Sequence, residues 1–240
     1  MTLADLTAAV PGTLGRMRDF VTMGGPAMTA IAVLSVVTLA LILWKLWRLV
    51  RFGAWSGGRH SETALSLWSA GRRAEAQAVL AGRRSLRARL VATAMAAADD
   101  AALTQDEAQA ETTRVARQLL ARARAGLRGI ELAATIGPLL GLFGTVTGMI
   151  AAFQALQEAG ARADPATLAG GIWEALLTTA AGMAVAIPAQ IALTWFEAVI
   201  ERLRHDMEDT ATRVFVPRPA RETARQQRKS TPAKALSVAE

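Results

Sequence analysis

Three long apolar stretches stand out along a chain that is otherwise rich in charge. Residues 20–44, 132–157 and 175–196 each contain no charged side chain. The third stretch becomes longer if one acid, Glu174, is accepted within it. A helix needs about 20 predominantly apolar residues to cross a hydrocarbon core roughly 30 Å thick, and each stretch is long enough. The pattern therefore predicts an all-α membrane protein with three transmembrane helices, at residues 20–44, 132–157 and 167–196.

The composition agrees with a membrane location and excludes several kinds of site. Hydrophobic residues make up 52% of the 240 residues, and the mean hydropathy of +0.27 is unusual for a soluble domain. Because cysteine is absent, disulfides, thiolate metal sites and cysteine nucleophiles are excluded. His60 and His205 have no acid or histidine cluster at metal-ligand spacing, so we expect no metal or other cofactor. No nucleophile–base–acid set is apparent, and we expect no enzymatic activity.

Basic residues near the ends of the apolar stretches predict the orientation. Within about 18 residues, four follow the first stretch, five precede the second and three follow the third; two precede the first and one follows the second. Because basic flanks stay in the cytoplasm, we expect segment 1–19 and a short loop, 158–166, outside. Residues 45–131 and 197–240 are then cytoplasmic. The formal net charge of +7 reflects this topology, and no nucleic acid partner is expected.

The cytoplasmic segment 45–131 is predicted to be helical. It is rich in alanine, arginine, leucine and glutamate and contains no proline, which favours helices. Ser61 is expected to cap a helix that runs through Trp68. The sequence Thr-Gln-Asp-Glu at residues 104–107 matches a capping box. We also expect one continuous helix from about residue 105 to 157, since no strong helix breaker precedes the glycine-proline pair of the second stretch.

The third transmembrane helix is expected to continue into the cytoplasm over residues 197–216. Asp164 followed by Pro165 is typical of a helix start. Residues 217–240 are polar, basic and interrupted by prolines, which predicts a disordered tail. The apolar residues that recur at helical spacing along the extension are Phe196, Val199, Ile200, Leu203, Met207 and Val214.

Glu174 is the one charged residue within the third predicted transmembrane helix. If that helix enters the bilayer near residue 167, Glu174 lies about 10 Å deep at 1.5 Å per residue. An acid at mid-helix costs roughly 2.5–3.5 kcal/mol, so its side chain must face protein or water. No lysine or arginine lies in the three stretches to neutralise it. A carboxyl group that alternates between neutral and ionised forms suits proton transfer; the alternative is a permanently neutral structural acid.

Two threonines follow Glu174 on the same helix. At 100° per residue, Thr178 lies about 40° from Glu174 around the helix and Thr179 about 140°. The spacing therefore favours Thr178 on the face of the glutamate. A threonine in a membrane helix commonly bonds to a backbone carbonyl, and this structural role is open to both.

Small residues form packing faces on the second and third predicted helices. On the second, glycines recur at spacings of four, three and four, beside Thr145. Such faces let helices approach closely, and a proline among them requires neighbours to satisfy the freed backbone groups. We infer more packing surface than one chain can use internally, which predicts a homo-oligomer. The expected packing residues are Gly137, Pro138, Gly141, Gly144, Gly148, Gly171, Gly182 and Pro188.

Three motifs in these helices resemble the ExbB/TolQ/MotA proton-channel family. They are GPLLGLFGTV at residues 137–146, GGIWEALLTTAAG at 170–182 and AIPA at 186–189. The cytoplasmic segments resemble the family only in length and helicity. The chain length, the three spans and the outward N-terminus fit the ExbB and TolQ branches, because MotA-like subunits are usually larger and have a fourth span. On this resemblance the chain is identified as an ExbB-like subunit of the inner (cytoplasmic) membrane.

The resemblance implies a motor complex and its site residues. Such complexes are homopentamers around a pair of single-span ExbD- or TolR-type partners, whose membrane aspartate supplies a second carboxyl group. Glu174 corresponds to the family's membrane glutamate, and Thr145 and Thr179 correspond to its pore-lining threonines. The resemblance thus favours Thr179 where the spacing favours Thr178. Trp173 is bulkier than the small residue expected at its position.

The function implied by the resemblance is to use the proton motive force to energise a TonB-type transducer for outer-membrane transport. A TolQ-like subunit that acts through a TolA-type transducer in envelope maintenance is the nearest alternative. A passive membrane scaffold, in which Glu174 stays neutral, is an alternative of another class. A solute transporter is a third, although three spans and one charge offer little room for a substrate site.

Overall fold

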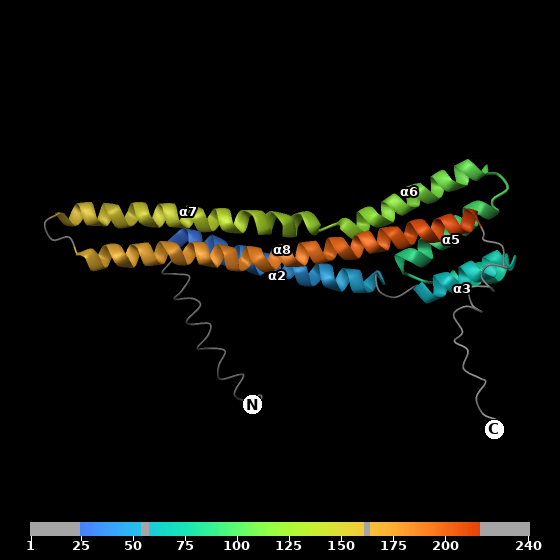
Figure 1. The fold of residues 1–240 in the computed structure, drawn as a ribbon, viewed down its shortest axis with the longest axis horizontal. Coiled ribbons are helices and arrows are strands. Elements are labelled where there is room, and N and C mark those ends of the chain that lie inside the picture. Colours follow the sequence, from blue (N-terminus) through green and yellow to red (C-terminus); the bar gives the residue numbers. More distant parts are fainter. Residues whose placement is uncertain (1–24, 54–57, 161–163, 217–240) are drawn as a thin grey trace, which may run out of the picture. The chain divides into compact units, whose positions relative to one another are not determined.

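The computed structural model describes residues 25–53, 58–160 and 164–216, and the regular elements in these ranges are all α-helices (Figure 1). The expected outer segment 1–19, the start of the first span, part of the outer loop and the tail 217–240 lie outside the described residues. The helices are α2 (Gly25–Arg51), α3 (Gly58–Ser69), α4 (Arg73–Leu80), α5 (Leu86–Asp99), α6 (Gln105–Arg124), α7 (Leu127–Ala159) and α8 (Pro165–Phe215).

The helices divide between two compact units. The membrane unit comprises the described residues up to 46 and those from 126 to 196. The polar unit comprises residues 47–125 and 197–216, apart from the undescribed 54–57. Helices α2 and α8 contribute residues to both units, so each is described within one unit at a time.

Among the described residues, three helical segments are long and apolar enough to cross a membrane: α2, residues 105–159 and α8. Within the single chain, only 22–28% of each apolar window is buried. Large apolar side chains such as Val36, Phe143 and Ile187 are 70%, 59% and 58% exposed. Outward apolar side chains of this number suit lipid or further protein rather than water. The predicted all-α membrane fold with three candidate spans is confirmed.

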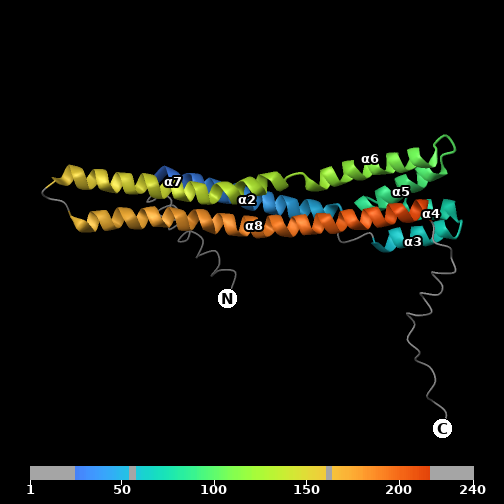
Figure 2. The ribbon, with the colours of Figure 1, turned by 45° about the horizontal axis from the view of Figure 1, so that its top comes forward.

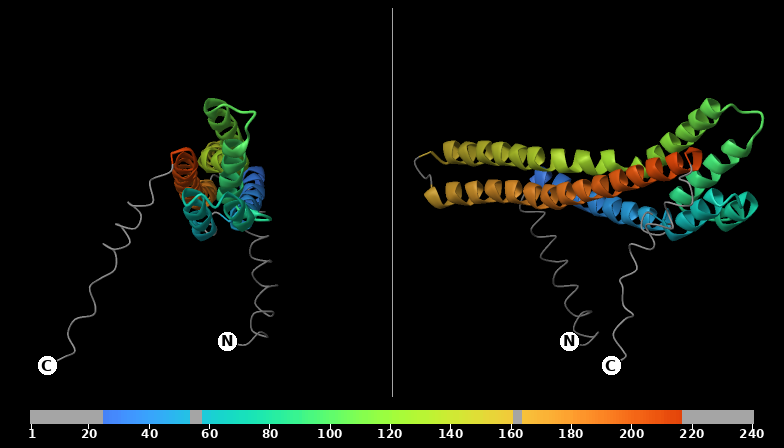
Figure 3. Two further views of the ribbon diagram at one scale, coloured as in Figure 1. Left: turned by 90° about the vertical axis from the view of Figure 1, so that its right-hand side faces the viewer. Right: turned by 45° about the vertical axis from the view of Figure 1, so that its right-hand side comes forward.

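Within the membrane unit, α2, α7 and α8 lie side by side (Figure 2 and Figure 3). Glycines on α7 allow α2 to pack closely against it. A Cβ atom added at Gly129 would lie 3.1 Å from Leu41 Cδ1, and one at Gly144 would lie 3.1 Å from Ala27 Cβ. The three apolar helices therefore form one packed layer around small residues.

The prediction of one continuous helix from about 105 to 157 is wrong. The helix breaks at Ala125–Gly126, between α6 and α7 (Figure 1). Gly126 has φ of 89°, a left-handed conformation that glycine adopts without strain. A Cβ at Gly126 would also lie 2.6 Å from Trp44 Cζ3, so the indole occupies the space that a side chain would need. Pro138, in contrast, lies inside α7 without ending it.

The prediction that Ser61 caps a helix is also wrong. Helix α3 begins three residues earlier, at Gly58, and ends at Ser69. Ser61 is 1% exposed within this helix, and its hydroxyl finds no hydrogen-bond partner among the described residues. Serine has a local preference for the N-cap of a helix, where its hydroxyl accepts a hydrogen bond from a backbone N–H of the first turn. Here the packing of the side chain into the interior of the polar unit overrides it.

Other expected helix features agree with the structure. Thr104 caps α6 in a complete capping box, in which its hydroxyl accepts from the Glu107 backbone N–H and the Glu107 carboxylate accepts from the Thr104 backbone N–H. The Asp164 carboxylate accepts from the Ala166 backbone N–H at 2.9 Å, where α8 begins. Helix α8 continues to Phe215, and the predicted apolar stripe from Phe196 to Val214 is buried.

The polar unit has a hydrophobic core of its own. Trp68 Nε1 donates a buried hydrogen bond of 3.1 Å to the Val214 carbonyl, and Arg213 binds Glu62 through two bonds of 2.7 and 2.8 Å. These contacts fasten the end of α8 to α3. The core comprises Ala64, Leu65, Trp68, Ala76, Leu80, Ala88, Val91, Ala94, Met95 and Val214.

Candidate functional site

The glycine faces of α7 and α8 meet within the chain. A Cβ at Gly182 would lie 2.4 Å from the Gly137 carbonyl oxygen, and a Cβ at Gly141 would lie 2.9 Å from Thr179 Cα. Both distances are to backbone atoms, so a side chain at either glycine requires the helices to move apart. The two backbones thus approach as closely as the small-residue pattern allows.

Two further expected packing residues, Gly148 and Gly171, lie along the same contact, whereas Pro188 is exposed. A Cβ at Gly148 would lie 3.0 Å from Ala175 Cβ, and a Cβ at Gly171 would lie 2.6 Å from Ala152 Cβ. Pro188 lies inside α8, as Pro138 lies inside α7. Much of the small-residue surface is therefore used between α7 and α8 of one chain. The glycine contacts within one chain neither require nor exclude a further subunit, and the homo-oligomer stays a prediction.

The threonines near this contact satisfy their hydroxyls on backbone carbonyls. Thr178 is 3% exposed and donates to the Ala175 carbonyl at 2.7 Å, with the Gly141 carbonyl 3.4 Å away. Thr179 is half-buried and donates to the same Gly141 carbonyl at 3.0 Å. Thr145 is half-buried and donates to the Leu142 carbonyl at 2.7 Å. The threonine hydroxyls of α8 therefore converge on one carbonyl of α7.

Glu174 lies on the outer surface of the membrane unit. It is exposed, and its carboxylate makes no hydrogen bond or ion pair with any residue that the structure describes. Trp173 beside it is 68% exposed, whereas Ala175 is 2% exposed and packs against α7. A carboxylate at membrane depth needs protein or water around it. In this chain those surroundings must come from outside the membrane unit.

Glu174 and Thr178, which the helical spacing places on one face, differ in exposure: Glu174 is exposed and Thr178 is buried. Thr178 is enclosed between α7 and α8, with Gly144 directly against its side chain: a Cβ at Gly144 would lie 2.5 Å from Thr178 Oγ1. Thr179 and Thr145 are less enclosed, so their hydroxyls are closer to surfaces that a partner can reach. A helical-wheel angle cannot predict this, because it places a residue around its own helix and not against the neighbouring one.

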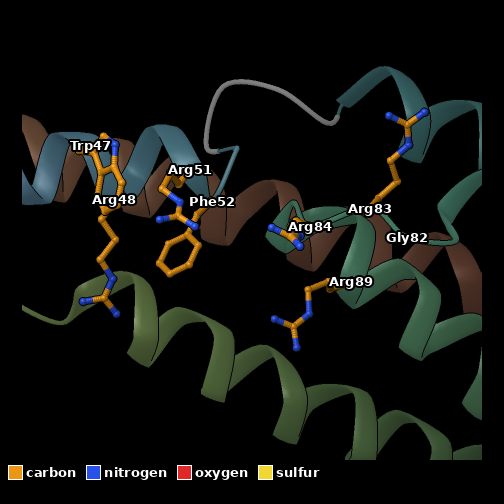
Figure 4. A pocket seen from close by; sticks show the side chains of 8 residues that line it. All are labelled: Trp47, Arg48, Arg51, Phe52, Gly82, Arg83, Arg84 and Arg89. Atoms are coloured by element: carbon orange, nitrogen blue, oxygen red, sulfur yellow. The ribbon is translucent and has the colours of Figure 1, made fainter.

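A feature that sequence reasoning missed lies in the polar unit. Arginines at the end of α2 and around the start of α5 line a common pocket (Figure 4). The sequence signals were Arg48 and Arg51 after the first apolar stretch and the adjacent Arg83 and Arg84. From the sequence we interpret Arg48 and Arg51 only as topological charge, because nothing in the sequence shows that they come together with Arg83 and Arg84.

Comparison with known proteins places the chain in a family. A model of the MotA/TolQ/ExbB proton channel family matches residues 82–209, which include α5, α6, α7 and most of α8. The biopolymer transport protein exbB1 of Vibrio cholerae is 38% identical over 86 residues, which are 34% of this chain and 38% of that protein. The biopolymer transport protein ExbB of Salmonella typhimurium is 37% identical over 106 residues, 43% of each chain.

A TolQ protein is also similar. The Tol-Pal system protein TolQ of Pseudomonas aeruginosa is 48% identical over 73 residues, which are 29% of this chain and 31% of that protein. The chain thus matches less than half the length of each of these relatives. The family model, in contrast, matches more than half of this chain. The chain therefore belongs to the MotA/TolQ/ExbB proton channel family, as its membrane motifs predicted, and resembles the ExbB branch.

Proposed function

We propose that the chain is an ExbB-like subunit of an inner-membrane complex that couples proton flow to mechanical work. The observation that carries this proposal is Glu174, an exposed carboxylate without a described partner in a helix that can span a membrane. Family membership supports the same function. In this proposal Glu174 accepts a proton from the outer side and releases it inward.

The two less enclosed threonines complete the proposed proton path. Thr145 and Thr179 each hold a hydroxyl on a backbone carbonyl while staying half-buried. A hydroxyl both donates and accepts a hydrogen bond, so each threonine can pass a bond on to water or to a carboxyl group of a partner. Thr178 is proposed as a packing residue, because its hydroxyl and methyl group are enclosed. This choice agrees with the residue implied by the family resemblance.

The proposed complex is a homopentamer around single-span partners that carry a membrane aspartate. Its support in this chain is the exposed surface around Trp173 and Glu174, which lipid alone would solvate poorly because it includes a charge. We propose an outward N-terminus and a cytoplasmic C-terminus from the distribution of lysine and arginine. Residues 45–131 and 197–216 then form a helical base in the cytoplasm.

The client of the complex is proposed as a TonB-type transducer for outer-membrane transport. A TolQ-like role with a TolA-type transducer is a second candidate, which the 48% identity to a TolQ protein favours. The two share one proton chemistry and differ in the partner. Co-purification with epitope-tagged transducers of both types decides between them, since an ExbB-like subunit retains the TonB-type protein and a TolQ-like subunit the TolA-type protein.

Proton flux through reconstituted complexes tests the mechanism. The wild-type chain with a single-span aspartate partner should acidify vesicles loaded with a pH dye, and Glu174→Gln should reduce the flux to background without loss of assembly. Glu197→Gln is the matched control, because Glu197 is exposed on the same helix just beyond the apolar stretch. Normal flux through an assembled Glu174→Gln complex would refute the proton-carrier role. If the wild-type complex carries no proton flux, the result would favour the alternative of a passive membrane scaffold.

A further inference from the structure

We propose that the arginine pocket at the end of α2 binds the headgroup of an anionic phospholipid. The pocket lies within the polar unit and has a volume of about 620 Å³. Among the residues that the structure describes, no acidic side chain lines it. This site is independent of the proposed proton path. The arginines that line it are Arg48, Arg51, Arg83, Arg84 and Arg89.

Three of the pocket arginines have no carboxylate partner in the described part of the chain. Arg83, Arg84 and Arg89 form no salt bridge with any carboxylate that the structure describes. Some other arginines of the polar unit are paired with carboxylates: Arg213 binds Glu62, and Arg204 binds Glu201 and Glu208. Grouped like charges repel one another and attract a counter-anion. The pocket is therefore a site for an anion that another molecule supplies.

Helix α2 brings this charge close to the membrane surface. Arg51 follows Trp44, the last residue of the first apolar stretch, by seven positions in one helix, which is about 10 Å at 1.5 Å per residue. The headgroup layer adds about 5–7 Å on each side of the hydrocarbon core, so the backbone of Arg51 lies just outside it and the long side chain can extend back to the phosphates. An anion of the bilayer itself is thus the nearest source.

Aromatic side chains in the pocket favour a lipid over a soluble anion. The guanidinium carbon of Arg51 lies 4.5 Å from the centre of the Trp47 ring, and that of Arg48 lies 5.3 Å from the Phe52 ring. Trp47 is 56% exposed. Tryptophan at the end of a membrane helix belongs to the aromatic belt, where rings meet headgroups and the first acyl carbons. A phospholipid satisfies both the arginines and these apolar faces, whereas a free phosphate satisfies only the arginines.

The arrangement of the side chains fits more than one phosphate. Figure 4 shows Arg84 extending toward the end of α2, where Arg51 and Phe52 lie, while Arg89 projects from α5 and Arg83 turns away from Arg84. A guanidinium group can donate two parallel hydrogen bonds to one phosphate. With Arg51 on α2, Arg84 in the loop before α5 and Arg89 on α5, a lipid with two phosphates, such as cardiolipin, should bind more tightly than one with a single phosphate. Basic pockets of this kind bind such headgroups.

Lipid binding to the purified full-length chain tests the proposal. Native mass spectrometry of the delipidated protein would compare cardiolipin, phosphatidylglycerol and phosphatidylcholine with identical acyl chains. Because each basic residue near the surface contributes a factor of about five in affinity, the double variant Arg84→Gln/Arg89→Gln should bind cardiolipin about 25-fold more weakly. The matched control is Arg114→Gln/Arg117→Gln, which removes two exposed arginines of α6 that do not line the pocket and lie well before the second apolar stretch, and it should retain affinity within about twofold.

Three results would overturn the proposal. The first is equal cardiolipin affinity in the pocket variant and the control. The second is equal binding of phosphatidylcholine and cardiolipin by the wild type. The third is full displacement of cardiolipin by inorganic phosphate, which would make the pocket a site for soluble anions. If the glutamine variant fails to fold, Arg84→Lys/Arg89→Lys keeps the charge, removes the guanidinium forks and should still lower the preference for cardiolipin over phosphatidylglycerol. An unchanged preference in the lysine variant counts against the site.

Discussion

The membrane unit and the polar unit both hold helices together, but with different side chains. Where α7 and α8 meet, the contact consists of glycine, alanine and threonine, and the helix backbones nearly touch. Where α3 and α5 meet the end of α8, the contact adds tryptophan, leucine, valine and methionine to alanine, edged by an arginine–glutamate pair. The helices of the membrane unit meet backbone to backbone, whereas those of the polar unit meet through their side chains.

This difference follows from the solvent around each unit. In water, large apolar side chains stabilise a contact because their surface leaves water, by roughly 25 cal/mol per Å². In a bilayer that gain is absent, since lipid tails are as apolar as leucine. Close backbone packing and hydrogen bonds then drive association, which explains the glycines and the threonine–carbonyl bonds between α7 and α8. Helix α8 makes both kinds of contact, small residues against α7 in the membrane unit and larger side chains in the polar unit.

The largest effect is expected from a methyl group added to the glycine contact. Gly182→Ala places a Cβ 2.4 Å from the Gly137 carbonyl oxygen, a separation that only a shift of the helices can relieve. We expect loss of the folded membrane unit, measured as the yield of monodisperse protein in detergent. Gly170→Ala on the same helix is the control, because its Cβ would have no neighbour within 4 Å. Equal yields of the two variants would show that backbone contact does not stabilise this unit.

A smaller effect is expected from truncating the main core residue of the polar unit. Trp68→Ala removes a side chain that is 9% exposed, together with its bond to the Val214 carbonyl. The local stability should fall by about 3–5 kcal/mol, read from hydrogen exchange of the α3 amides in the full-length chain. Trp68→Phe keeps an aromatic ring and should lose only about 1 kcal/mol from the missing hydrogen bond. If both variants exchange alike, burial of the ring is not what stabilises the contact.

The smallest effect concerns a helix end that is exposed to water. The hydrogen bonds from the backbone N–H and then the hydroxyl of Thr104 lower the pKa of Glu107 below its ordinary value of 4.5. A lowered folded-state pKa gives stability that is complete above the ordinary value and is lost as the pH falls through the folded value. The protection of the α6 amides against exchange, relative to an unfolded chain at the same pH, should therefore decrease below about pH 4.5.

A variant without the cap shows how much of the pH dependence comes from the Thr104–Glu107 pair. Thr104→Ala should lower the stability of α6 by about 1 kcal/mol near neutral pH, and the difference from the wild type should shrink in acid. Thr113→Ala is the control, since Thr113 is exposed inside α6 and its hydroxyl bonds to the Gln109 carbonyl of its own helix. A difference that stays constant with pH would assign the effect to the threonine alone.

Features that depend on a few adjacent residues could be predicted. The Thr104–Glu107 capping box joins side chains and backbone groups within four residues, so its pattern in the sequence suffices. The Asp164–Pro165 start of α8 is of the same kind. The break at Gly126 was missed because a single glycine in an alanine- and arginine-rich segment is tolerated inside helices. Its left-handed conformation accompanies the placement of Trp44 against it, which is a contact between residues 82 positions apart.

The candidate site was predictable in its chemistry and not in its contacts. Glu174 stood out because a charge in an apolar stretch is costly wherever the stretch packs. The environment of Thr178 depends on how α7 is placed against α8, and the spacing along one helix contains no information on that placement. The arginine pocket combines α2 with the region before α5, and each arginine alone looked like an ordinary charge near a membrane.

The sequence by itself determined the three apolar helices, the acid within one of them and the family, because hydropathy, charge and motif are properties of consecutive residues. The tertiary structure alone decided which surfaces the glycines join, which threonine is enclosed and which arginines share a pocket. These outcomes depend on distances between segments far apart in the chain, and only packing, which excludes overlap and pairs polar groups across helices, sets those distances.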